Sequence, residues 1–227
     1  MTLTIYNELE QGSDEWLQAR CGLLTASVIG KLITPATLKV ADNDFSRGAV
    51  ETLVAERISG HVDYVHPSLD MQRGSLDEPY ARALYAERYA PVEEIGFAVR
   101  EINGLKLGAS PDGLVGETGG IEIKSRKPRV QLKAFLTGEV PRENIAQVQA
   151  CLFVLGREWW DYVSYAGGWP LFVKRVYPDP RWQAAIIAAL ETFEEKAEQM
   201  MNTYRNASHG NPIAPRIDHF ADAEIRI

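Results

Sequence analysis

Residues 110–125 read SPDGLVGETGGIEIKS, and this stretch decides the expected fold of the chain. It holds a Pro-Asp-Gly turn sequence, a Gly-rich turn (GETGG) and an apolar strand that carries polar residues. Successive side chains of a strand point to opposite faces, so Ile121 and Ile123 share one face while Glu122 and Lys124 share the other. The stretch therefore predicts a β-hairpin with one apolar and one polar face.

A hairpin folded at GETGG brings Asp112 opposite Glu122, within one residue of register, with Lys124 on the same face. Two carboxylates in one buried site repel each other and raise a pKa, and a divalent cation removes that cost. Oxygen ligands of this kind favour Mg²⁺ or Mn²⁺ over zinc. Such a cation keeps positions open for a substrate phosphate and for water. Lys124 beside it can act as an electrophile or help to deprotonate the attacking water.

The same residues also fit an ordinary hairpin. Pro-Asp-Gly is a common turn tripeptide, and an Asp in that position often caps its own backbone. Glu-x-Lys is unremarkable on a strand face that water covers. The residues alone therefore leave two interpretations open, a solvated hairpin and a metal site that acts on phosphates.

Hydrophobic spacing on both sides of the hairpin predicts a chain that mixes helices and strands. The expected helices span residues 13–21, 25–34, 47–60, 75–90, 141–156 and 180–206. The expected strands outside the hairpin span residues 93–102, 105–110, 159–167 and 171–178, and residues 35–46 are expected to form a polar loop. This order is typical of an α/β or α+β domain, in which helices flank a mixed β-sheet.

Length and composition indicate a globular protein that can bury a sizeable core. The 227 residues are 45% hydrophobic and 24% charged. We expect one domain over residues 1–227, with its core at about 13–205 and a loosely held tail at 206–227. No apolar run reaches the roughly 18 residues that a membrane span needs, so no membrane association is expected. Cys21 and Cys151 lie too far apart for a cysteine framework or finger, and free thiols fit a cytoplasmic location.

The formal net charge of −7 argues weakly against nucleic-acid binding, because phosphate affinity depends on a local basic surface. The strongest basic run is KSRKPRVQLK, residues 124–133. A charge run is usually a solvated face. Beside a site that cleaves phosphates it fits a DNA track better, and Lys39 and Arg47 could add contacts.

Pro111-Asp112 and Glu122-Ile123-Lys124 resemble, in order and spacing, the motif of the PD-(D/E)xK nuclease superfamily. The chain more narrowly resembles the phage lambda exonuclease family, the alkaline exonucleases of viral-type recombination. The supporting stretches are WLQARCGLLTAS (16–27), RGSLDEPYA (73–81) and IAQVQACLFVLG (145–156). The resemblance implies a restriction-endonuclease-like core.

By this resemblance Asp112 and Glu122 are metal ligands, the Ile123 backbone carbonyl supplies a further oxygen, and Lys124 is the catalytic lysine. It also implies two more catalytic residues. Glu78 would be an additional acid near the metal, and Gln147 would orient a water or hold Lys124.

Both added residues have plainer interpretations. Glu78 fits a capping box with Ser75, although Pro79 weakens that signature because it lacks the N–H of a first turn. Gln147 could be a surface residue; Gln149 points to a different helix side, so at most one of the two glutamines faces the site.

Arg20 and Ser27 form a candidate anion site. Ser27 falls in the first turn of the helix expected to be capped by Thr25, where free N–H groups attract anions, and Arg20 can contact the same anion. In the resembled family this pair binds the terminal 5′-phosphate of the digested strand. A simple cap beside a surface arginine is the alternative.

The expected function is a Mg²⁺-dependent exonuclease, with Mn²⁺ as a substitute, that degrades one strand of double-stranded DNA from a 5′-phosphorylated end. It would leave 3′ single strands for recombination in a bacterial or phage-infected cell. The resemblance further implies a ring-shaped homotrimer and a single-strand annealing partner. The alternatives are an endonuclease of restriction or junction-resolving type on the same fold, and a non-catalytic DNA-binding recombination adaptor.

Overall fold

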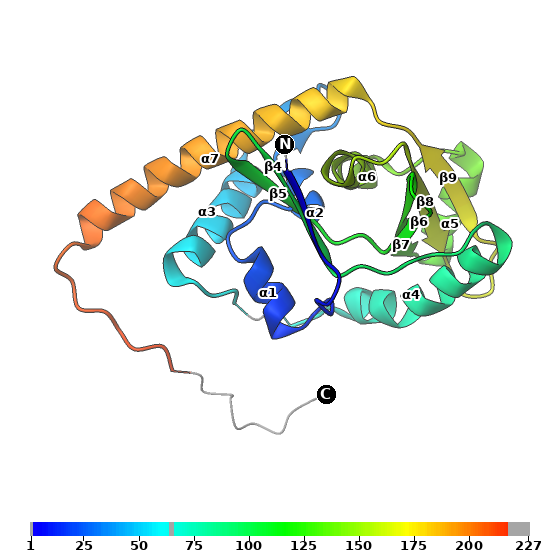
Figure 1. Cartoon of the computed structure of the whole chain (residues 1–227), viewed down its shortest axis with the longest axis horizontal. Coiled ribbons are helices and arrows are strands. Elements are labelled where there is room, and N and C mark those ends of the chain that lie inside the picture. The colour runs from blue at the N-terminus through cyan, green and yellow to red at the C-terminus, as the bar shows by residue number, and fades with distance from the viewer. Residues whose placement is uncertain (1, 64–65, 218–227) are drawn as a thin grey trace.

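The computed structural model describes residues 2–63 and 66–217, and Figure 1 shows their arrangement. The chain is a mixed α/β structure, which confirms the expected fold class. The helices are α1 (Asp14–Arg20), α2 (Ala26–Ile29), α3 (Asp44–Ser59), α4 (Leu69–Arg88), α5 (Pro128–Thr137), α6 (Arg142–Leu155) and α7 (Pro180–Ser208). The strands are β1 (Thr2–Tyr6), β2 (Ile33–Thr34), β3 (Lys39–Val40), β4 (Phe97–Ile102), β5 (Leu105–Ala109), β6 (Gly113–Val115), β7 (Gly119–Ser125), β8 (Trp159–Tyr165) and β9 (Phe172–Val176).

The predicted hairpin forms from β6 and β7, which pair antiparallel around a turn at residues 116–118. Gly119 and Gly120 belong to β7 and lie against the indole rings of Trp159 and Trp160 in β8. A Cβ on either glycine would come within 2.3 Å of those rings. The two glycines therefore allow the close approach of β8. The turn itself covers residues 116–118 and does not include them.

β7 lies inside a four-stranded mixed sheet with the order β6-β7-β8-β9. β7 and β8 run parallel, which requires a crossover, and α5 and α6 supply it. α4 packs on the face of β7 that carries Ile121 and Ile123, while α6 lies over the sheet from the other side (Figure 1). Because both faces are covered, Glu122 is buried and the hairpin is not a solvated one.

A second, antiparallel sheet has the order β1-β4-β5. Its β4–β5 turn is at Asn103-Gly104, as the sequence predicts, with φ of 52° and 83°. Residues 110–112 lead from β5 in this sheet to β6 in the four-stranded sheet. The Pro-Asp dipeptide therefore lies at the junction of the two sheets. Asp112 directly precedes β6 and lies beside β7.

A buried ionic network fixes α4 to the four-stranded sheet. Asp161 of β8 is 2% exposed and accepts hydrogen bonds from the Tyr85 hydroxyl at 2.7 Å and from the Arg175 guanidinium at 2.8 Å. Tyr85 follows Glu78 by seven residues on α4, so both lie on the same side of the helix. Anchoring Tyr85 therefore fixes the direction in which Glu78 points.

Two of the predicted helices have a boundary that is wrong by more than one helical turn. The helix expected over residues 25–34 is shorter in the structure, where α2 covers Ala26–Ile29 alone. The Thr25 hydroxyl contacts the Ser27 hydroxyl and makes no capping hydrogen bond to the backbone of α2. α4 begins at Leu69, capped by Ser68, and so contains Ser75 in its interior. The capping-box interpretation of Glu78 is therefore wrong.

Other elements were not expected. β1 and α5 were missed, and residues 35–46 contain β3 and the first turn of α3. Pro128 in the first turn of α5 was a usable start signal, but the charges of the basic run obscured the weak apolar pattern. α7 extends past the sheets to Ser208, and the part of the expected tail at 218–227 lies outside the described residues (Figure 1). Among the described helices none combines the length and apolar character of a membrane span.

Candidate active site

A cleft of about 470 Å³ opens between the N-terminal half of α4 and the end of β7. Glu78, Asp112, Ile123 and Lys124 line it. Glu122 lies behind this lining and is 0% exposed. Five of the positions singled out in the sequence, from α4, the sheet junction and β7, therefore meet at one place.

Asp112 and Glu122 take the positions that the hairpin register requires. Since Gly113 pairs with Ile121, the preceding Asp112 faces Glu122. Asp112 Oδ2 accepts a hydrogen bond from the Ile123 backbone N–H at 2.5 Å. Lys124 Nζ lies 2.5 Å from Glu122 Oε1. Two carboxylates and one ammonium therefore share one face of the hairpin.

When its groups are ionised, this cluster has two negative charges, on Asp112 and Glu122, and one positive charge, on Lys124. Burial raises the pKa of Glu122 to about 8, and the negative charge of Asp112 adds to the shift although Lys124 opposes it. Burial also raises the pKa of Asp112. Burial alone would lower the pKa of Lys124, but the Glu122 and Asp112 carboxylates outweigh burial and raise it. Added positive charge would stabilise the ionised carboxylates.

The donor set fits a small divalent cation. Glu122 Oε2 has no hydrogen-bond partner within the described chain and Oε1 has only the Lys124 ammonium beside it, although buried polar atoms are normally satisfied. Asp112, Glu122 and the Ile123 carbonyl would offer oxygen ligands, the type that Mg²⁺ and Mn²⁺ prefer. In residues 2–63 and 66–217 no three His, Cys, Asp or Glu side chains converge as a complete ligand set. Water and substrate oxygens would complete a magnesium shell.

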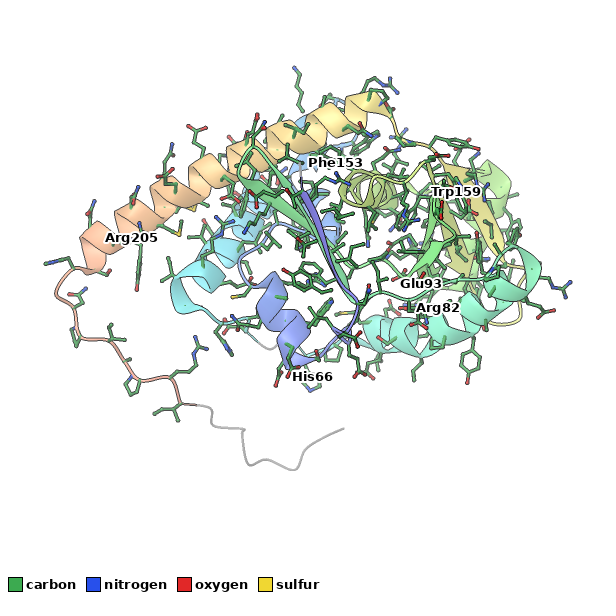
Figure 2. The ribbon with its side chains drawn as sticks, viewed as in Figure 1. His66, Arg82, Glu93, Phe153, Trp159 and Arg205 are labelled. Atoms are coloured by element: carbon green, nitrogen blue, oxygen red, sulfur yellow. The ribbon has the colours of Figure 1, made fainter. Side chains whose placement is uncertain are left out.

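Glu78 reaches the cleft from α4. Burial raises its pKa to about 7, and Asp112 is the next largest cause. Its carboxylate is ion-paired with Arg82, one turn further along the helix. Arg82 lies between α4 and the sheet (Figure 2), donates to the Asp112 backbone carbonyl at 2.9 Å, and pairs with Glu94 at 2.8 Å. Arg82 therefore joins the helix that carries Glu78 to the loop that carries Asp112.

Gln147 and Gln149 are separated as the helix geometry predicts. Gln149 is buried and bonds to the Tyr177 carbonyl and the Asp179 N–H, which is a structural role. Gln147 is partly buried and lies one turn before Cys151. Burial raises the pKa of the Cys151 thiol and the charge of Glu122 adds to the shift, which places this side of α6 near the carboxylates. Gln147 therefore lies on the same side of α6 as Cys151, but it does not line the cleft and no hydrogen bond joins it to Lys124.

Arg20 and Ser27 lie together, as the sequence predicts, with Arg20 Nη2 donating to Ser27 Oγ at 3.4 Å. The Arg20 guanidinium covers the Trp16 ring at 3.8 Å. Burial lowers the pKa of Arg20 to about 10, partly offset by the charge of Glu56. Because α2 has only four residues, the anion attraction comes from these two side chains rather than from a long helix dipole.

Trp16 connects this pair to the loop that carries Asp112. Its indole N–H donates to Ser110 Oγ at 2.9 Å, two residues before Asp112. Gln11 Nε2 donates to the Pro111 carbonyl at 3.1 Å. The segment that begins the chain therefore fixes the backbone from which Asp112 projects.

Sequence reasoning missed several side chains of the cleft. Arg82 was not considered, although its spacing of four from Glu78 is an ion-pair signal. A polar chain also crosses the cleft wall, in which Ser125 donates to Asp77 at 2.6 Å and Arg73 donates to Ser125 at 3.0 Å. No local pattern announces the latter contacts, since α4 and the end of β7 are about 50 residues apart in the chain.

Comparisons with known proteins agree with this architecture. Residues 15–158 match the family described as the YqaJ-like viral recombinase domain. The crystal structure of an alkaline exonuclease (LHK-Exo) from Laribacter hongkongensis is similar with a TM-score of 0.76 and 32% identity, covering 86% of this chain and 98% of that one. The crystal structure of LHK-Exo in complex with dAMP is similar with a TM-score of 0.75 and 31% identity, and again covers 86% of this chain and 98% of that one. A search of the curated proteins found no match.

A phage-related exonuclease from Haemophilus somnus 129PT has a TM-score of 0.61 at 13% identity, covering 80% of this chain and 96% of that chain, and so shares the fold. The fold and the cleft together define a nuclease of the alkaline exonuclease type. The chain belongs to the YqaJ-like viral recombinase domain family, which confirms the resemblance drawn from its motifs.

Proposed function

We propose that this chain is a Mg²⁺-dependent exonuclease that degrades one strand of double-stranded DNA from a 5′-phosphorylated end. The product would be a duplex with a 3′ single strand, the form that strand annealing uses. Family membership and the likeness to LHK-Exo support a nuclease that acts on DNA. Metal dependence, polarity and end preference are the parts added by the proposal.

The observation that carries the proposal is the buried carboxylate of Glu122, which lies beside Asp112 and has Lys124 as its single polar side-chain partner. A structural carboxylate in a core would be satisfied by hydrogen bonds, as Asp161 is. Glu122 instead keeps one oxygen without a partner, and the single charge of Lys124 faces two carboxylates. That arrangement suits a residue whose partner is a cation brought with or before the substrate.

In the proposed mechanism Asp112, Glu122 and the Ile123 carbonyl would hold Mg²⁺, which would lower the pKa of a bound water and neutralise charge on the phosphate. Lys124 keeps its proton beside two carboxylates and places a positive charge against the scissile phosphate. Glu78 adds a carboxylate at the cleft wall that can hold the attacking water. Gln147 would orient the same water from α6.

The 5′ end would be recognised by Arg20 and Ser27. Arg20 pairs with no carboxylate among the described residues, so its guanidinium is available for a terminal phosphate. Its connection through Trp16 to Ser110 would set the distance from the bound end to Asp112. This pair favours an exonuclease over an endonuclease of restriction or junction-resolving type.

Digestion of a labelled linear duplex tests the proposal. We expect nucleotide release with Mg²⁺ or Mn²⁺, none after chelation, and faster release from 5′-phosphorylated than from 5′-hydroxyl ends. If the protein releases no nucleotides with either metal, the enzyme hypothesis fails and the adaptor alternative stands. Equal cutting of circular and linear DNA would favour the endonuclease.

The biological setting is part of the proposal. A ring-shaped homotrimer would place the basic run of each copy around the duplex and reconcile DNA binding with a net charge of −7. A single-strand annealing protein would take the 3′ strand, in the cytoplasm of a bacterial or phage-infected cell. Sedimentation of the purified protein measures the first of these expectations directly.

A further inference from the structure

Arg126 is held rigidly at the end of β7. Its backbone N–H donates to the Tyr165 carbonyl at 2.7 Å. Its guanidinium donates to Asn144 Oδ1 on α6 and, from Nη2 at 3.1 Å and Nε at 3.3 Å, to the Tyr162 hydroxyl on β8. Contacts to two elements, α6 and β8, therefore fix the position of this residue.

All side-chain partners of Arg126 are neutral. The other cations that line the cleft have carboxylates, since Arg73 and Lys127 pair with Asp70 at 2.7 and 3.0 Å and Lys124 pairs with Glu122. Arg126 forms no ion pair with any residue that the structure describes. Its Nη1 group also takes part in no hydrogen bond there, although Arg126 lines the cleft. The cleft therefore contains a fixed positive charge with free donors and no counter-ion.

Arg126 continues the row of side chains that begins at Glu122. In an extended chain residues two apart share a face at a spacing of about 7 Å, so Glu122, Lys124 and Arg126 follow one another along the cleft. Arg126 therefore lies beyond Lys124 in this row. It would contact a different group of a bound DNA strand, next to the group that Lys124 contacts. A preorganised guanidinium without a counter-ion is suited to a phosphate.

We infer that Arg126 binds a backbone phosphate of the DNA strand in the cleft, next to the phosphate that Lys124 faces. The inference rests on the proposed function, because it takes DNA as the occupant of the cleft. Asn144 and Tyr162 would be positioning residues, which hold Nε and Nη2 so that Nη1 points to the ligand. The alternative is that Arg126 only ties α6 to β8.

The test is DNA binding of a blunt, labelled duplex with Ca²⁺ in place of Mg²⁺, measured over a series of salt concentrations. We expect Arg126→Gln to weaken binding about tenfold and to reduce the slope of log K against log salt by about 0.9, the value for one phosphate contact. Arg126→Lys should retain the slope while binding more weakly, because it keeps the charge and loses the fork.

Arg157→Gln is the matched control, since it removes one charge at the opposite end of the hairpin, where Arg157 donates to the Gly116 carbonyl at 2.8 Å. Its slope and affinity should equal those of the parent. If Arg126→Gln also keeps the parental slope and affinity, the inference is overturned and the proposed nuclease function is untouched. A parent protein that binds no duplex removes the proposed function itself.

A second measurement has its main readout on the parent protein, so that readout does not depend on how a variant folds. Single neutral methylphosphonates are placed at each of the first internucleotide linkages from the 5′ end. One position next to the cleaved linkage should weaken binding by the parent about tenfold, and weaken Arg126→Gln no further. If no single substitution lowers the parent's affinity, the contact does not exist.

Discussion

Asp112 accepts a hydrogen bond from the backbone N–H of Ile123 at 2.5 Å, and this contact closes the hairpin at the point where its two carboxylates meet. One oxygen of Asp112 is thereby committed to the strand that carries Glu122 and Lys124. The geometry of the pair is set by backbone as well as by side chains. Changes at Glu122 should therefore act on charge more than on the position of Asp112.

Glu122→Gln should separate stability from activity. The amide keeps the shape of the side chain and removes a buried charge that Lys124 compensates only in part, since the pKa of Glu122 is still raised to about 8, so the metal-free protein should gain about 2 kcal/mol at pH 8. For a chain of this length that is about 4 to 8 °C in Tm. Metal-dependent nucleotide release should fall at least about 100-fold. A variant that digests DNA at the parental rate would show that Glu122 is not a ligand.

The stability of the metal-free protein should fall as the pH rises. The pKa of Glu122 is raised to about 8, whereas a carboxyl of the unfolded chain titrates near about 4.3. Between these values the folded protein holds a proton that the unfolded chain releases, so the stabilisation is complete below about pH 4.3 and is lost as the pH passes 8. Thermal melts from pH 5 to about 9 measure this, and Mg²⁺ should flatten the decline.

The same melts on Glu122→Gln provide the control, since the variant lacks the titrating group. Its Tm should vary less with pH over that window. Glu78, whose pKa is raised to about 7, supplies a smaller decline that remains in the variant. A parental Tm that rises from pH 5 to about 8 would contradict the buried-charge description.

Arg82→Gln should lower kcat more than it lowers DNA affinity. The change removes the contacts to Glu78, to the Asp112 carbonyl and to Glu94, so two site residues lose their shared support. A loss of about 10- to 100-fold in kcat is expected from misplaced groups. Arg88→Gln, on the same helix but 68% exposed, should leave the rate unchanged.

Metal titration separates this positioning role from general destabilisation. Mn²⁺ binding without DNA should weaken in Arg82→Gln and recover only partly in Arg82→Lys, because one ammonium cannot replace three directed contacts. Parental Mn²⁺ affinity in Arg82→Gln, together with a lower Tm, would assign Arg82 to folding alone.

Arg20→Ala should remove the preference for phosphorylated ends. One charge-assisted contact is worth about 1.4 kcal/mol or more, so the ratio of 5′-phosphate to 5′-hydroxyl digestion should drop at least about tenfold. Arg181→Ala is the control, because that exposed arginine is paired with Asp179 at 2.8 Å and has no place in the proposed DNA contacts. If the parent cuts both ends alike, the end-binding role of Arg20 and Ser27 is wrong.

The sequence by itself determined the hairpin and its polar row. Strand alternation places Glu122 and Lys124 on one side, and the turn length places Asp112 against Glu122. These are local consequences of backbone geometry, so they can be obtained from residues 110–125 alone. The Arg20–Ser27 contact also followed from short spacing, although the helix expected after Thr25 was too long.

Only the tertiary structure decided whether that row is solvated or buried. Burial of Glu122 depends on α4 and α6 covering both faces of β7, and no short-range pattern encodes which distant helices pack there. The same packing brings Glu78 and Arg82 to Asp112, and leaves Arg126 with neutral partners only. Charge compensation depends on neighbours in space, which is why the sequence predicted the polar row and only the structure shows that Arg126 has no carboxylate partner among the described residues.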